Sequence, residues 1–229
     1  MTFSIVGCGG DEGPPPTSVS LLSSTPWELP ETSVYRIEQG DIEGSGSITI
    51  EERGNDLVVD QSFEGGGFSS GAEAVVDATE LTPATVDLVV EGDEGTVRCH
   101  AEYDGGSVTA KWVLPDDETT LELDVESRSY DSWTDLILWR TLPFAENTEA
   151  RYSVVASCRR PRQRPESADV RVTVEGTDTV RVPAGSFEAW VVKVRVQGET
   201  QVAWYSTEPA HQLVRYDNGD QVFELESIN

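Results

Sequence analysis

Apolar and polar residues alternate along most of the chain from about residue 33 onward. Clear examples are the valine- and threonine-rich segments TVDLVV, SVTAKWVL, DVRVTV and AWVVKVRV. An apolar period of two buries one face of a strand and leaves the other in water. Polar turns separate the segments, among them RGND, EGDEG, YDGGS, EGTD, QGET and YDNGD. The pattern predicts an all-β fold, a curved antiparallel meander that forms a half-barrel or an open barrel.

One segment, DSWTDLILWRTLPF at residues 131–144, breaks this alternation. Its four consecutive apolar residues, 136–139, do not fit a strand with one wet face. Ser132 and Asp135 have the spacing of a helix N-terminal capping box, and Pro143 ends the segment. We therefore expect one short helix near residues 131–140, or an irregular plug, against the sheet.

The N-terminal sequence Ile5-Val6-Gly7-Cys8 resembles the lipobox of bacterial-type lipoproteins, in which the cysteine thiol carries a diacylglycerol. The resemblance implies an exported protein held on a membrane of the cell envelope through Cys8. Residues 1–8 would be the remnant of a signal, because only seven residues precede the cysteine and none is Lys or Arg. Residues 9–32, with many Gly, Pro and Ser, are typical of a flexible tether, which leaves 33–229 as a single β-domain. The alternative is a plain exposed thiol on an unstructured end.

The charge of the chain narrows the classes of partner. The formal net charge is -26, from 42 acidic and 16 basic residues, and only two of the basic residues are lysines. Nucleic acid is excluded as a partner, because its phosphates would be repelled. An acidic excess with few lysines is typical of halophilic proteins, in which salt screens the self-repulsion. We expect such an origin, and a fold that loses stability in low salt.

Two cysteines remain after Cys8. Alternation places Cys99 with Val97 and Ala101 on one face of a strand, and Cys158 with Val154 on one face of another. Both thiols are therefore expected to point inward. In an exported protein they would form a disulfide that closes a long loop, whereas otherwise they are two buried thiols that pack as small apolar groups.

Motifs for catalysis and metal binding are weak. GFSSG at residues 67–71 has the G-x-S-x-G form with Ser69 as nucleophile, but it lies inside a β-meander and is better interpreted as a glycine-rich turn. The two histidines, His100 and His211, are far apart, and no cysteine or histidine pair has the spacing of zinc ligands. We predict no enzymatic activity, no metal and no cofactor.

Tryptophans and arginines supply the candidate binding residues. Trp112, Trp139 and Trp190 would either fill the core or line an apolar cavity. The sequence RRPRQRP at 159–165 is a basic loop in an acidic protein. Such a loop would either contact an anionic partner or balance neighbouring acids, through Arg159, Arg160, Arg162 and Arg164.

The segments VRVPAGSFEAWVVKVRV and VAWYSTEPAHQLVRYDNG resemble a family of exported bacterial β-domains, domain of unknown function thirty-one-oh-eight (DUF3108). LILWRTLPF is similar to another of its segments, through Arg140, Leu142 and Pro143. The resemblance implies a curved antiparallel sheet, akin to the half-barrels of periplasmic lipoprotein carriers, and no catalytic residues. The matching motif residues are Val182, Pro183, Ala184, Gly185, Phe187, Trp204 and Tyr205.

Together these features predict a non-catalytic, lipid-anchored envelope protein that holds an apolar or lipid-like ligand on the concave face of its sheet. The alternative is an envelope scaffold with a filled core, whose surface binds another envelope protein.

Overall fold

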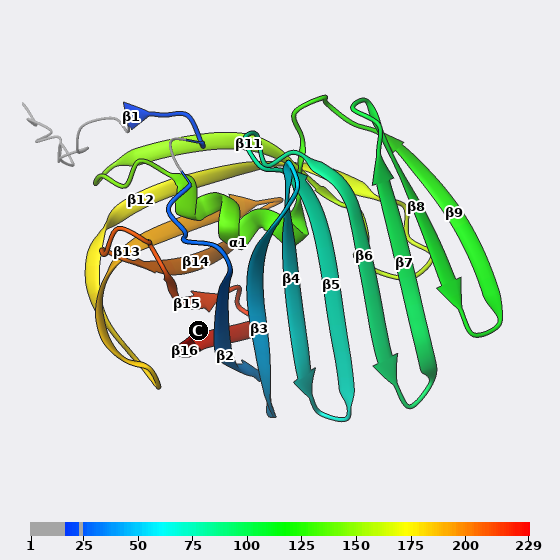
Figure 1. The fold of residues 1–229 in the computed structure, drawn as a ribbon, viewed down its shortest axis with the longest axis horizontal. Helices are drawn as coiled ribbons and strands as arrows, with labels where there is room; N and C mark the ends of the chain where they lie inside the picture. The colour runs from blue at the N-terminus through cyan, green and yellow to red at the C-terminus, as the bar shows by residue number, and fades with distance from the viewer. Residues whose placement is uncertain (1–16, 23–24) are drawn as a thin grey trace, which may run out of the picture.

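The structure is a computed structural model that describes residues 17–22 and 25–229, and it confirms the all-β prediction (Figure 1). The described strands form one sheet and pair almost entirely antiparallel. Their bounds are β1 (Thr17–Ser18), β2 (Glu31–Gln39), β3 (Ile42–Arg53), β4 (Asp56–Gly65), β5 (Phe68–Asp77), β6 (Pro83–Gly92), β7 (Gly95–Tyr103), β8 (Ser107–Leu114), β9 (Asp117–Asp124), β10 (Tyr130–Asp131), β11 (Thr148–Ala156), β12 (Glu166–Val182), β13 (Gly185–Val196), β14 (Glu199–Ser206), β15 (Leu213–Asp217) and β16 (Gln221–Ile228).

Two meanders make up the sheet. Strands β2 to β9 pair in chain order, as do β11 to β16, and β16 pairs antiparallel with β2 to join the two meanders. Both meanders curve around a common hollow (Figure 1). The alternation in the sequence therefore fixes an inner face, and Tyr35, Ile50, Val172 and Leu225 are among the side chains it buries.

The ends of the sheet are joined by a covalent bond rather than by strand pairing. β9 ends one side of the sheet, and on the other side β11 pairs only with the two-residue parallel strands β1 and β10 beyond β12. A disulfide links Cys99 on β7 to Cys158 just after β11, with their Cα atoms 5.8 Å apart. Both cysteines point inward, but Cys158 lies in a turn and not on a strand as the alternation suggested.

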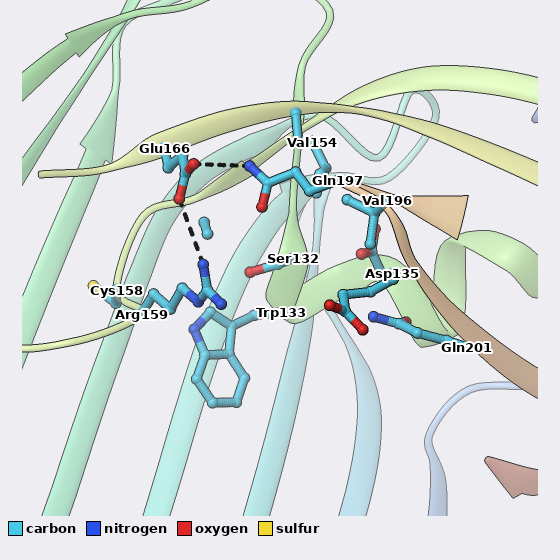
Figure 2. A pocket seen from close by; sticks show the side chains of 13 residues that line it. Ser132, Trp133, Asp135, Val154, Cys158, Arg159, Glu166, Val196, Gln197 and Gln201 are labelled. Carbon is cyan, nitrogen blue, oxygen red and sulfur yellow. Dashed lines mark hydrogen bonds and ion pairs between the residues drawn. The ribbon is translucent and has the colours of Figure 1, made fainter. Parts of the chain in front are cut away.

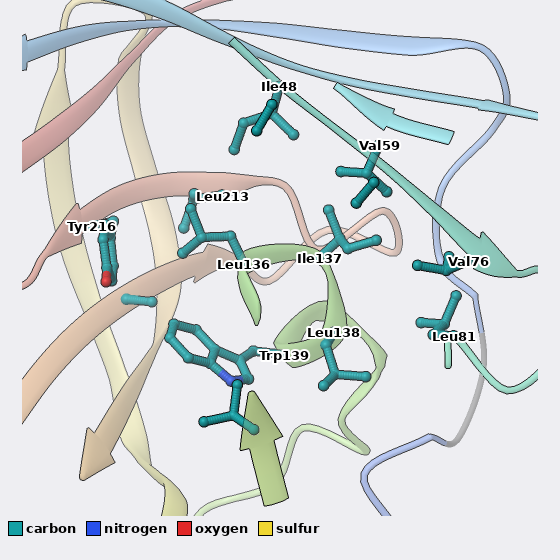
Figure 3. Packing of buried hydrophobic residues seen from close by; sticks show 14 of the residues in the cluster. Ile48, Val59, Val76, Leu81, Leu136, Ile137, Leu138, Trp139, Leu213 and Tyr216 are labelled. Atoms are coloured by element: carbon teal, nitrogen blue, oxygen red, sulfur yellow. The ribbon is translucent and has the colours of Figure 1, made fainter. Parts of the chain in front are cut away.

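A helical segment fills the hollow of the sheet. It consists of η1 (Ser132–Thr134), α1 (Asp135–Leu138) and η2 (Trp139–Thr141), and all four residues of the apolar run 136–139 are buried. Figure 3 shows them packed between residues of both meanders, such as Ile48 and Leu213. The N-cap is Asp131, whose carboxylate accepts from the Trp133 N–H at 2.9 Å, and not Ser132. We call residues 131–142 the plug.

Two predicted turns are wrong. EGTD, residues 175–178, lies inside the long strand β12, where a register shift between Val174 and Gly176 absorbs an extra residue. This is a β-bulge, and Gly176 has the positive φ of 139° that such an irregularity favours. In GFSSG the turn is confined to Gly66 and Gly67, so Ser69 lies on strand β5.

The tether predicted over residues 9–32 differs from the structure in its described part. Thr17 and Ser18 pair with β11, and Leu21 and Trp27 are only 7% and 8% exposed. Apolar side chains in this stretch thus complete the core, which a count of Gly, Pro and Ser does not reveal. Residues 1–16 lie outside the described part of the chain, and Cys8 is among them.

Candidate functional site

The main candidate site is a cavity of about 310 Å³ between the start of the plug and strands β11 to β14 (Figure 2). We call it the side cavity. The plug contributes polar side chains and one tryptophan, and the strands contribute small apolar side chains and amides. Its lining residues are Ser132, Trp133, Asp135, Val154, Ala156, Cys158, Arg159, Glu166, Ala168, Val196, Gln197, Glu199 and Gln201.

Small side chains create this space. On the inner face of β11 and β12, Ala168 pairs with Val154, and Ala156 pairs with Glu166. Further along β12, the equivalent inner position is occupied by the larger Val170, which is fully packed. Alanine at residues 156 and 168 therefore leaves a hollow where valine elsewhere fills the core.

Asp135 is the chemically distinctive group in the side cavity. Its Oδ1 accepts a hydrogen bond from the Tyr152 hydroxyl at 2.6 Å, and that hydroxyl accepts from Trp139 Nε1 at 2.8 Å. No described residue donates to the other carboxylate oxygen, which lies on the cavity side beside Gln201 (Figure 2). Burial raises the pKa of Asp135 to about 8, and the negative charge of Asp131 raises it further. The carboxyl is thus mostly protonated at neutral pH.

The rim of the side cavity is acidic. Arg159 lies 3.4 Å from Glu166, and Gln197 also donates to Glu166 at 2.8 Å. The one cation in the lining is therefore paired, while Glu199 has no ion pair among the described residues. Two carboxylates and Asp135 face a single arginine, so the cavity favours positively charged or hydrogen-bond-donating groups.

The tryptophans proposed to line a cavity lie elsewhere. Trp112 and Trp139 are each 1% exposed and belong to the packed core. Trp190 is half-buried and stacks on Phe144, with ring centroids 6.0 Å apart. The tryptophan on the side cavity is Trp133, which also borders a smaller cavity of about 110 Å³ between the plug and strands β2 to β5. Its position at the polar start of the plug was the available sequence signal.

The basic loop is partly neutralised. Arg162 forms an ion pair with Asp117 at 2.9 Å, and Arg159 pairs with Glu166 as described. Arg160 and Arg164 are exposed and have no ion pair among the described residues. The loop thus balances acidic neighbours with two arginines and presents the other two to solvent.

The motif shared with DUF3108 is structural. Pro183 and Ala184 form the turn of the β12–β13 hairpin, with Val182 paired to Gly185, whose φ is 140°. The Tyr205 hydroxyl donates to the carbonyl of Leu136 at 2.8 Å and so fixes the plug to β14. Phe187 and Trp204, expected as core anchors, are half-buried, and Trp204 lies against the Arg215 guanidinium.

The other candidate chemical groups do not assemble into a site. Ser69 lies on an antiparallel strand pair, which lacks the strand–turn–helix geometry of a nucleophile elbow. His100 pairs with Asp87 on the surface at 2.8 Å, whereas His211 packs on Phe144. Within residues 17–22 and 25–229, no group of three or more His, Cys, Asp or Glu is placed to hold a metal ion. The same residues include no helix with the length and apolarity to span a bilayer.

An open β-barrel-like sheet with an internal plug and one side cavity defines the class of this protein. The chain belongs to the family described as protein of unknown function (DUF3108), whose model matches residues 33–226. No curated protein matches the chain.

Two solved structures are similar to the chain. A β-barrel-like protein of domain of unknown function DUF1849 from Brucella abortus has a TM-score of 0.61 at 12% identity, over 87% of this chain and 97% of that chain. A DUF1089 family protein from Pseudomonas aeruginosa has a TM-score of 0.40 at 16% identity, over 96% of this chain and 97% of that chain. The first likeness supports the β-barrel-like fold and nothing beyond it.

Proposed function

We propose that this protein is a non-catalytic, lipid-anchored component of the cell envelope that binds a small ligand with an apolar body in the side cavity. The observation that carries the proposal is a cavity of about 310 Å³ with largely apolar walls and a single carboxylate oxygen left without a donor. Ligand sites in proteins are of this kind, with volumes from ~300 Å³ and a few polar groups that orient the ligand.

The location of the site differs from the expected concave face. The plug occupies that hollow with packed side chains, so a large lipid would have to displace Leu136, Leu138 and Trp139 from the core. Removing that much apolar surface from the interior would cost several kcal/mol, at about 1.5–3 kcal/mol per side chain. The side cavity needs no such displacement.

A binding role is favoured over catalysis by the lining itself. Ser132 is its only hydroxyl side chain, and the lining has neither a histidine nor a lysine to act as a base. Asp135 is hydrogen-bonded to Tyr152, which is itself held by Trp139, so the carboxyl belongs to a fixed polar chain.

Filling the cavity tests ligand binding. Ala168→Trp would place an indole in the side cavity, and Ala84→Trp would place one on an exposed position of β6. Native mass spectrometry of protein isolated from its own membrane should show a bound small molecule on the wild type and on Ala84→Trp. It should be absent from Ala168→Trp with an unchanged circular dichroism spectrum. Equal ligand occupancy in all three proteins, or none in the wild type, would refute the proposal.

Membrane attachment is supported by the lipobox-like sequence before Cys8 and by a disulfide, which is typical of an oxidising compartment. Two acyl chains on one cysteine would anchor the chain stably. Intact-mass analysis of the wild type should show a diacylglyceryl addition on a chain that starts at Cys8. Cys8→Ala should lack the addition and leave the membrane fraction, and a wild-type chain without it would exclude the anchor.

A second candidate function is protein binding through the basic loop. It is favoured by one observation, that Arg160 and Arg164 are exposed without an ion pair among the described residues of a chain with net charge -26. Crosslinking in the native envelope should then capture an acidic partner with the wild type and not with Arg160→Ser/Arg164→Ser. Retained capture with that variant would exclude the loop as the interface.

A further inference from the structure

We infer that the side cavity selects ligands with an ammonium head group, which Asp135 binds while the apolar walls hold a short hydrocarbon body. This inference rests on the proposed binding function and deepens it. It follows from the one free carboxylate oxygen, from the sign of the charges around it and from the shape of the cavity.

The geometry leaves Asp135 one binding direction. Its Oδ1 is already used by the Tyr152 hydroxyl, on the side of β11. The other oxygen faces the cavity, where the Gln201 amide from β14 is the nearest polar neighbour in view (Figure 2). A donor that enters the cavity can thus reach both a carboxylate oxygen and an amide oxygen, which together satisfy two of the three N–H bonds of a primary ammonium.

No described cation neutralises Asp135. The titratable groups that act on it are Tyr152 from β11, Tyr205 from β14, Tyr216 from β15 and the carboxyl of Asp131 from β10. None of the four carries a positive charge. The side cavity adds Glu166 and Glu199, and its only arginine, Arg159, is paired with Glu166.

An anionic ligand is disfavoured by the same charges. A carboxylate head would lie against Asp135 and the acidic rim, inside a molecule with a net charge of -26. An ammonium head would supply the missing counter-charge, and burial strengthens that attraction. A neutral hydroxyl head would hydrogen-bond but gain no charge pairing.

Proton release distinguishes these ligands. Because burial raises the pKa of Asp135 to about 8, the carboxyl holds a proton at lower pH that an ammonium must expel. Apparent affinity for an alkylammonium should therefore rise about tenfold per pH unit up to pH ~8, or roughly fiftyfold between pH 6 and pH 8. The ligand stays charged throughout, since amines of this type titrate near ~10.4. Affinity for an alcohol should not rise in this way.

Isothermal titration calorimetry on the full chain tests the inference with hexylammonium, hexan-1-ol and hexanoate at pH 6 and pH 8. We expect hexylammonium to bind at least tenfold more tightly than hexan-1-ol at pH 8, hexanoate not to bind, and protons to be released at pH 6. Asp135→Asn should abolish both the preference and the pH dependence. Asp41→Asn, at an exposed turn, should preserve them, and Gln201→Glu should strengthen hexylammonium binding.

The outcomes separate this inference from the proposed function. Equal binding of hexan-1-ol and hexylammonium, unchanged in Asp135→Asn, would overturn the ammonium selectivity and leave an apolar site in place. Ligand-free native protein together with no binding of any of the three probes would overturn both.

Discussion

Arg140 is the residue that ties the plug to the rest of the molecule. Its guanidinium donates to both carboxylate oxygens of Glu31, at 2.7 and 3.1 Å, and to the carbonyl of Ala210 at 2.7 Å. It is buried and lies 5.5 Å from the Trp27 ring. One planar side chain thus connects the plug with the start of β2, with the segment before β15 and with the N-terminal stretch. Lysine could not form this bidentate contact.

Arg140→Met should destabilise the protein strongly, because it leaves the Glu31 carboxylate buried without a counter-charge. We expect a loss of about 3–5 kcal/mol in the free energy of unfolding, measured by urea denaturation. Arg53→Met, which breaks an exposed pair with Glu73 at 3.3 Å, should cost less than ~1 kcal/mol. A double replacement of Arg140 and Glu31 by Met should recover part of the loss. Equal losses for Arg140→Met and Arg53→Met would contradict the assigned role.

Asp135 should make stability fall as pH rises. An unfolded aspartate titrates near ~3.9, whereas burial raises the pKa of Asp135 in the folded protein to about 8. Between these values the folded state holds a proton that the unfolded state has released, so rising pH favours unfolding across this window. Asp135→Asn removes that penalty. Its free energy of unfolding should match that of the wild type near pH 4 and exceed it increasingly up to pH 8.

Urea unfolding at each pH unit from 4 to 8 measures this difference, with Asp41→Asn as the exposed control. A difference between Asp135→Asn and wild type that stays constant with pH would show that the carboxyl is not protonated in the folded state.

Among single elements, β9 is the strand with an open edge. The Val125 N–H donates to Gly106 O at 2.9 Å, and Asp117 pairs with Leu114 at the other end of the hairpin. Hydrogen-bonded and non-bonded pairs alternate between these points, so Thr119 bonds to β8 while the N–H of Thr120 points to the open edge. Acidic side chains along β9, such as Glu122, discourage pairing with another copy of the chain.

Proline at two adjacent threonines should therefore have opposite outcomes. Thr120→Pro removes an N–H that has no partner in the sheet, so the free energy of unfolding should change by less than ~1 kcal/mol. Thr119→Pro removes a hydrogen bond to Trp112 and should cost about 1–3 kcal/mol. Chemical denaturation of both variants measures the contrast. Equal effects would show that the phase of the β8–β9 ladder is different.

At the scale of the whole molecule, the disulfide holds together two ends of a sheet that strand pairing leaves open. Cys99 and Cys158 are 59 residues apart in sequence. A crosslink over such a loop stabilises the folded state by about 4 kcal/mol in the chain-entropy description. Cys99→Ser/Cys158→Ser should lose an amount of this order, and reduction of the wild type should give the same loss. A melting temperature unaffected by either change would contradict the closure role.

The net charge of -26 should make the stability of the fold depend on salt. Screening shortens the Debye length from ~10 Å at 0.1 M to ~3 Å at 1 M salt, which reduces repulsion among surface carboxylates. We expect the melting temperature to rise steadily from 0.1 M to 2 M KCl, as for a halophilic protein. Sucrose at matched water activity is the control for general solute effects. Identical melting temperatures at both salt concentrations would refute this expectation.

The sequence by itself determined the fold class and most strands, because alternation of side chains is a local property that each segment carries on its own. It located the plug through the apolar run at 136–139, and it identified the DUF3108 family, whose model matches residues 33–226. Local rules failed at EGTD, where a polar glycine pair could equally be a turn or a bulge, and pairing with β13 decided for the bulge.

Only the tertiary structure decided the site. Asp135 is one of 42 acidic residues, and nothing in its neighbours along the chain distinguishes it. It becomes distinctive because the plug brings it against β11 and β14, whose residues are far away in sequence. The same packing fills the hollow with Trp139 and leaves space beside Ala156 and Ala168, since the volume of a cavity depends on which distant side chains meet there.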